Sequence, residues 1–153
     1  MKTFLVLAAW LACAFVAFGQ TPPPGPTAGT GDTRQLVVLP EPMRTHTIAN
    51  MRDHLLALQQ IHEKLSTGKF VEASDIAERR LGMSSLETHG AAHIAARLPP
   101  PMQDIGTRMH RAASRFAVET QAAAATNDVR PLLSALSAVM QQCVACHAAY
   151  RYQ

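Results

Sequence analysis

Five consecutive residues near the C-terminus carry the clearest chemistry in the chain: Cys143-Val144-Ala145-Cys146-His147. The C-x-x-C-H spacing is the pattern of covalent haem attachment. Each thiol can add to one vinyl group of a haem, and the histidine after the second cysteine is then held beneath the iron as its proximal ligand. The motif therefore predicts one covalently bound haem c, attached through Cys143 and Cys146 and ligated by His147.

Three other kinds of site also use paired cysteines. A thioredoxin-type redox pair expects a βαβ setting near the start of a helix, whereas this pair lies near the end of the last expected helix. A structural zinc site needs four ligands and usually a second close pair of cysteines. A disulfide across two intervening residues closes a very small loop and stabilises little. The adjoining histidine favours haem over all three.

The N-terminus has the composition of an export signal. Met1-Lys2 precedes an apolar run from Phe4 to Phe18, and Ala17-Phe18-Gly19 offers small residues where a signal peptidase reads the chain. The apolar run is about 15 residues long, short of the ~20 that span a bilayer as a helix. We expect residues 1–19 to be a cleaved signal peptide. The mature protein would then be periplasmic, with no stable membrane insertion.

The net charge of the chain gives little support for a nucleic-acid partner. The formal net charge is +3 and the pI is about 9.0. Lys2 would leave with the signal peptide, and two haem propionates would bring the total close to neutral. We therefore expect no nucleic-acid partner, and we expect redox proteins as partners. No serine-histidine-acid arrangement or nucleotide-binding loop is present, so the protein is not expected to be an enzyme.

The rest of the chain divides into a leader and a helical domain. Six prolines lie within residues 20–42, which predicts a flexible Pro/Gly-rich leader over residues 20–44. From residue 45 to residue 153 the pattern is helical, and no convincing alternating strand is found. Apolar residues at three- and four-residue steps predict helices over about 45–67, 70–81, 102–125 and 129–150, with a doubtful short helix within 83–101.

Each of the longer expected helices has one apolar stripe. Four such helices with short connections predict an all-α fold, an up-down-up-down four-helix bundle with C-terminal haem attachment. Leu56 and Ala57 are expected on the outer side of the first helix, where they leave a homodimer open. The expected inward positions are Ile48, Met51, Leu55, Leu58, Ile61 or His62, and Leu65 on the first helix, Ile105, Met109, Ala112, Phe116 and Thr120 on the third, and Leu132, Leu136 and Val139 or Met140 on the last.

A helical bundle with C-x-x-C-H near its end, followed by Ala148-Ala149-Tyr150-Arg151, resembles the cytochrome c-prime family, also called class II c-type cytochromes. The resemblance covers roughly residues 45–151. It implies either a five-coordinate haem that binds gases such as nitric oxide, or a six-coordinate, low-spin electron carrier with a methionine ligand on the first helix. Arg151 follows His147 by four residues, hence on the same helix face, and is a candidate haem contact. A solvated cation in the last helical turn is the alternative reading of Arg151.

The position opposite His147 decides between these two activities. In an up-down-up-down bundle the start of the first helix lies beside the end of the last. Met51 is expected about six residues into the first helix and His147 four to six residues before the end of the last, so their depths are similar at ~1.5 Å per residue. We expect Met51 to be the distal ligand of an electron-carrying cytochrome. A purely packing role for Met51 and an open gas site are the alternatives.

Other side chains could approach the iron or a second metal. His89 and His93 are four residues apart, a candidate metal pair, although Gly90 makes a helix there doubtful. The rival distal ligands are Met43, His46, Met83, His89, His93 and Met102. Packing or surface positions are expected for His54, His62, Met109, His110 and Met140.

Overall fold

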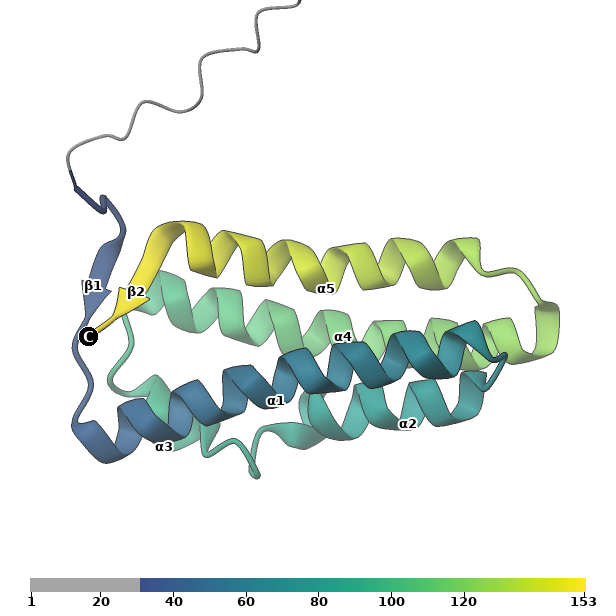
Figure 1. The fold of residues 1–153 in the computed structure, drawn as a ribbon, viewed down its shortest axis with the longest axis horizontal. Coiled ribbons are helices and arrows are strands. Elements are labelled where there is room, and N and C mark those ends of the chain that lie inside the picture. The colour runs from purple at the N-terminus through teal and green to yellow at the C-terminus, as the bar shows by residue number, and fades with distance from the viewer. Residues whose placement is uncertain (1–30) are drawn as a thin grey trace, which may run out of the picture. The chain divides into compact units, whose positions relative to one another are not determined.

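The computed structural model describes residues 31–153, so the expected signal peptide and the first part of the expected leader lie outside the described residues. The described chain is mostly helical, which confirms the all-α class (Figure 1). In order, its elements are β1 (Gln35–Val37), α1 (Glu41–Ser66), α2 (Phe70–Arg80), the 3-10 helix η1 (Met83–Ser85), α3 (Ala91–Ala95), α4 (Pro100–Thr126), α5 (Arg130–Ala149) and β2 (Tyr150–Tyr152).

Helix α1 begins earlier than the sequence suggested. Pro42 lies in its first turn, where the missing N–H leaves no hydrogen bond unmade. The Glu41 carboxylate accepts hydrogen bonds from Arg44 Nε at 2.8 Å and from Thr45 Oγ1 at 2.9 Å, which favours a helix start here. The compact unit spans Thr33–Gln153. The prediction of a flexible leader as far as residue 44 is therefore wrong for its last dozen residues.

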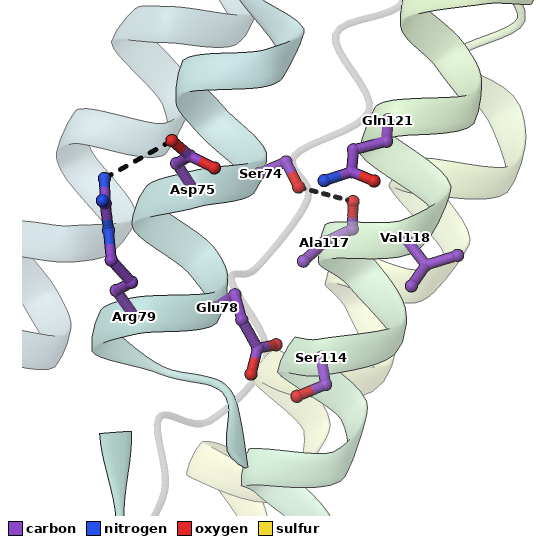
Figure 2. Close-up of a pocket in the computed structure, with 8 residues that line it drawn as sticks. All are labelled: Ser74, Asp75, Glu78, Arg79, Ser114, Ala117, Val118 and Gln121. Carbon is purple, nitrogen blue, oxygen red and sulfur yellow. Dashed lines mark hydrogen bonds and ion pairs between the residues drawn. The ribbon is translucent and has the colours of Figure 1, made fainter. Parts of the chain in front are cut away.

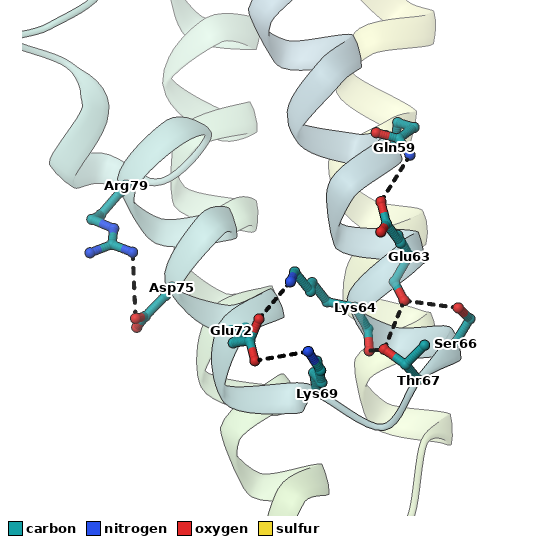
Figure 3. A network of polar contacts seen from close by, with 9 residues as sticks. All are labelled: Gln59, Glu63, Lys64, Ser66, Thr67, Lys69, Glu72, Asp75 and Arg79. Carbon is teal, nitrogen blue, oxygen red and sulfur yellow. Dashed lines mark hydrogen bonds and ion pairs between the residues drawn. The ribbon is translucent and has the colours of Figure 1, made fainter.

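A tight turn joins α1 to α2. Gly68 has a φ of +73°, a left-handed conformation that glycine adopts without a steric penalty, and it lies just after the end of α1. Figure 3 shows the charged side chains across this turn, where Lys64 Nζ lies 2.6 Å from Glu72 Oε2 and Lys69 Nζ lies 3.6 Å from Glu72 Oε1. These contacts are exposed and contribute little to stability, so the turn depends mainly on its backbone geometry.

Small side chains allow α2 to lie close to α4. Ala73 and Ala77 are completely buried between the helices. Ser74 is 1% exposed, and its Oγ donates a hydrogen bond to the carbonyl of Ala117 at 2.8 Å (Figure 2). A shallow groove runs along the outer side of this contact, lined by Glu78, Arg79 and other mainly polar side chains. The contact fixes α2 against the middle of α4.

Helix α4 is the centre of the described unit, because α2 packs on one side of it and α5 on another. The three prolines at 99–101 open α4 rather than merely ending an earlier segment. At its other end Asn127 has a φ of +56° and closes α4. Asp128 Oδ1 accepts a hydrogen bond from the backbone N–H of Arg130, the first residue of α5, at 3.1 Å.

Two short strands correct the prediction that the chain has none. β1 and β2 pair in parallel, with Gln35 opposite Tyr150 and Val37 opposite Tyr152. This pairing joins the segment before α1 to the end of α5. A small apolar cluster, here called the strand-end cluster, forms around it from buried Val37, Leu39, Met102 and Tyr150, with Met43, Leu98, Ile105, Cys146 and Tyr152 packed against it.

The apolar stripes of α4 and α5 follow the prediction, and that of α1 does not. Phe116, Leu132 and Val139 are at most 1% exposed. On α1, Ile61 is completely buried as expected, but Leu55 is 68% exposed and Ala57 is completely buried, so the buried face is rotated relative to the expected stripe. Ala57 is therefore not an outer residue, although Leu56 is 49% exposed. The expected homodimer through this helix stays a prediction.

Candidate functional site

Cys143 and Cys146 lie in the last two turns of α5, at the junction of two apolar clusters. Both thiols are free and half-buried. Cys143 packs against the main core, which includes Leu136 and Val139, and Cys146 packs against the strand-end cluster. The two cysteines are three residues apart and therefore share one side of the helix. Their position near the end of α5 differs from the helix-start position of a thioredoxin-type pair.

The surroundings of the two thiols do not favour thiolates. Burial raises the pKa of Cys143 and of Cys146 above its ordinary value. The same apolar surroundings raise the pKa of the nearby Tyr152 phenol to about 12, with the charge of a Cys146 thiolate as a second cause. Redox-active cysteines need a lowered pKa. The site is therefore built to hold neutral thiols, which argues against a thiol–disulfide exchange pair.

His147 presents an exposed imidazole on α5, next to an apolar stripe. Its backbone carbonyl accepts a hydrogen bond from Arg34 Nη1 at 3.4 Å. Met140 lies seven residues before it and Val144 three residues before it, on the same face of α5. Met140 is 47% exposed and Val144 is 67% exposed. The histidine thus adjoins apolar surface that the protein itself leaves uncovered.

The uncovered surface extends along α5. A hollow of about 630 Å³ runs along α5, lined by Leu133, Met140, Val144 and neighbouring residues. The backbones of α1 and α5 make few close approaches, whereas α4 packs along the whole of α5. α5 is also long and apolar enough to cross a membrane, with 17% of that stretch buried. An apolar helix that is covered on one side only needs another group to cover the rest.

The structure shows no contact between Met51 and His147, and it leaves open a position for Met51 opposite that histidine. Met51 is half-buried and belongs to neither apolar cluster of the described residues. By helix rise it lies ~15 Å from the start of α1, and His147 lies ~3 Å from the end of α5. The expected equal depth is therefore wrong when measured from the helix ends. The first turn of α1 extends beyond the end of α5, which reduces the mismatch (Figure 1).

Among the rival ligands, two methionines share an apolar cluster with Cys146. Met102 is 4% exposed in the strand-end cluster, and Met43 packs against the same cluster as Cys146. The His46 ring is engaged elsewhere, because its Nε2 donates to the carbonyl of His89 at 3.1 Å. Met83 is 39% exposed on η1, which packs beside α2 and α4. Met43 is thus the strongest rival to Met51.

Arg151 is not on the helix face that the sequence suggested. α5 ends at Ala149, and Tyr150 adopts an extended conformation with φ −130° and ψ 152°. Arg151 therefore lies in strand β2, opposite Leu36 of β1, and is half-buried there. Both its placement on the face of His147 and its reading as a last-turn cation are wrong, while contact with haem stays a prediction.

The candidate metal pair His89–His93 is not formed. His89 is 7% exposed, whereas His93 lies at the surface. His89 instead meets His54 of α1 and His110 of α4, both expected to be ordinary packing or surface residues. Three positions so far apart in sequence carry no shared local pattern, so no sequence signal could have grouped them.

The donor set at the end of α5 fits a c-type haem. Two half-buried neutral thiols, an exposed imidazole and uncovered apolar surface lie along one stretch of helix. Comparison with protein families, with curated proteins and with solved structures finds no match for this chain.

Proposed function

We propose that this protein is a periplasmic, mono-haem c-type cytochrome that carries single electrons between redox proteins. The observation that carries the proposal is the C-x-x-C-H motif, with its thiols half-buried at the junction of two apolar clusters beside uncovered apolar surface. A haem has large apolar faces, and covering α5 with one would remove that surface from water.

The proposed architecture is an up-down-up-down four-helix bundle of the cytochrome c-prime kind, made by α1, α2, α4 and α5. What supports it is the packing order: α1 against α2, α2 against α4, and α4 against α5. The missing close contact in such a bundle is between α1 and α5. That is where we place the haem.

In this proposal each side chain has a defined task. The Cys143 and Cys146 thiols add their S–H bonds across the two vinyl groups, which forms two thioethers without net oxidation. The His147 imidazole supplies the proximal nitrogen ligand, and Met140 and Val144 keep water from that side. When bound, haem supplies a one-electron iron couple whose potential depends on the axial ligands and on burial.

The sixth ligand sets the activity within this proposal. A Met51 thioether would favour the reduced iron and block access of small gases, as suits an electron carrier. The alternative is a five-coordinate haem that binds nitric oxide or another small gas. The exposed, apolar Leu55 beside the Met51 turn is the observation that favours it, because an apolar distal side holds no ligand.

The test is to produce the full chain in a host that exports and matures c-type cytochromes. The purified protein is expected to gain the mass of one haem and to keep it in denaturant. The Cys143→Ser/Cys146→Ser variant is expected to lose covalent haem completely, while His93→Gln, a change at an exposed histidine, keeps it. Wild-type protein without covalent haem in such a host would overturn the proposal.

A further inference from the structure

Three histidines from distant parts of the chain meet inside the described unit. His54 comes from α1, His89 from the segment between η1 and α3, and His110 from α4. The ring centroids of His54 and His89 are 4.8 Å apart, those of His54 and His110 are 6.1 Å apart, and those of His89 and His110 are 5.9 Å apart. His89 and His110 are 7% and 8% exposed.

Hydrogen bonds with the backbone hold the ring of His110 and the chain segment that carries His89. His110 Nδ1 lies 2.8 Å from the carbonyl of Leu81, and a carbonyl can only accept, so this nitrogen carries the proton. His110 Nε2 is therefore the nitrogen with a free lone pair. A metal-binding histidine characteristically donates its other N–H to a carbonyl in this way. The carbonyl of His89 accepts from Asn50 Nδ2 at 3.0 Å and from His46 Nε2 at 3.1 Å, which holds the His89 segment on α1.

The nearest pair of ring nitrogens already has the spacing of two ligands. His54 Nε2 and His89 Nδ1 are 3.4 Å apart. Two nitrogens bound tetrahedrally to zinc at 2.0–2.1 Å would lie ~3.3 Å apart. The same distance also fits a weak hydrogen bond between neutral rings, so the third histidine decides the nature of the site.

The charge state of the cluster suits metal binding. Burial lowers the pKa of His54 to about 4 and lowers the pKa of His89 and His110 as well, so all three rings are neutral at pH 7. Only neutral imidazole binds a metal. The charged groups that face the cluster are the Asp53 carboxylate and the Arg80 guanidinium, which form an ion pair with each other.

We propose that His54, His89 and His110 form a three-histidine site for one divalent transition-metal ion of the Zn²⁺ or Cu²⁺ kind. In residues 31–153, no three His, Cys, Asp or Glu side chains are already arranged around a common point that could hold a metal ion. Metal binding therefore requires the His110 ring to approach the other two, since three imidazoles on one zinc have centroids ~5.2 Å apart. The bound ion would join α1, α4 and the η1–α3 segment.

Zinc titration of the purified, haem-containing protein tests this site. After treatment with a chelator, isothermal titration with ZnCl₂ at pH 7.5 is expected to show one site per chain. His110→Gln and His89→Gln should each weaken zinc binding at least about tenfold. His62→Gln and His93→Gln change exposed histidines and should leave the affinity unchanged. Circular dichroism of each variant checks that it is folded.

Two results would overturn the proposal: no one-to-one binding by the wild-type protein, or unchanged affinity in a folded His110→Gln variant. If that variant does not fold, zinc X-ray absorption of the wild-type complex replaces it. Three imidazole ligands are then expected, and one or none would contradict the site. Loss of binding in His93→Gln would assign the zinc to the surface instead.

Discussion

The three-histidine cluster and His147 show two ways in which this chain presents imidazoles. His89 and His110 are buried, with their rings or backbones hydrogen-bonded to neighbouring elements. His147 is exposed, and the apolar residues on its face of α5 are uncovered. In the first region the protein itself supplies the hydrogen bonds and the burial. In the second region the apolar surface beside His147 is left exposed to solvent.

The helices that carry these regions differ in the same way. α4 has 27 residues and is packed by α2 and α5. α5 has 20 residues and uses one side for the core, leaving Leu133, Met140 and Val144 exposed. In the proposed function, this uncovered apolar surface on the helix that carries C-x-x-C-H is where the haem would bind.

The stability of the packed region around α4 should be sensitive to loss of side-chain volume. Phe116 on α4 is completely buried. Phe116→Ala removes most of that side chain, and we expect the free energy of unfolding to fall by about 3–5 kcal/mol because a cavity is left. Urea unfolding followed by circular dichroism measures the change. A loss below about 1 kcal/mol would show that α4 is not the central helix.

The histidine cluster should make the free energy of unfolding depend on pH. The folded-state pKa of His54 is about 4 against an ordinary 6.5, so between these pH values the unfolded chain binds more protons. Stability is therefore complete above pH 6.5 and falls as the pH drops towards 4, by about 3 kcal/mol from His54 alone. Urea unfolding of the chelator-treated protein across this range measures the slope. His54→Gln should flatten it and His62→Gln should not.

Substitutions on the uncovered face of α5 should affect stability only if another group covers that face. Met140 on α5 and Val118 on α4 are 47% and 64% exposed, and both are apolar. If haem covers α5, Met140→Ala should destabilise the haem-containing protein by about 1–2 kcal/mol, whereas Val118→Ala should stay within about 0.5 kcal/mol. Equal, small effects in the two urea curves would mean that nothing covers Met140.

A single buried hydrogen bond should give the smallest effect. The Ser74 hydroxyl donates to the Ala117 carbonyl between α2 and α4. Ser74→Ala should lower the free energy of unfolding by about 1 kcal/mol. Ser137 is exposed on α5, so Ser137→Ala should cause no loss. Thermal melts of the two variants make the comparison, and an equal response would contradict the α2–α4 contact described above.

Local patterns in the sequence predicted much of the fold. The C-x-x-C-H motif, the stripe around Phe116 and the break between the first two helices each depend on neighbouring residues, and the helices appear near their expected positions. The buried face of α1 was misjudged because its core contacts use small Ala57 in place of larger Leu55. Apolar size alone does not reveal which side of a helix meets a close neighbour.

Long-range pairings account for what the sequence could not predict. The three-residue strands β1 and β2 exist only because the two ends of the unit meet, and neither has an alternating pattern. That pairing ends α5 at Ala149 and takes Arg151 off the helix. The histidine cluster likewise joins positions 54, 89 and 110, which come together only in the folded chain.

The most direct test of the central claim is the optical spectrum of the haem-containing protein before and after addition of carbon monoxide. Haem on Cys143, Cys146 and His147 with Met51 opposite predicts a low-spin spectrum with a methionine-to-iron charge-transfer band and little carbon monoxide binding. Met51→Ala should become high-spin and bind carbon monoxide readily, while Met43→Ala keeps the wild-type spectrum. A high-spin wild-type spectrum with ready carbon monoxide binding, or an unchanged Met51→Ala spectrum, would contradict the account.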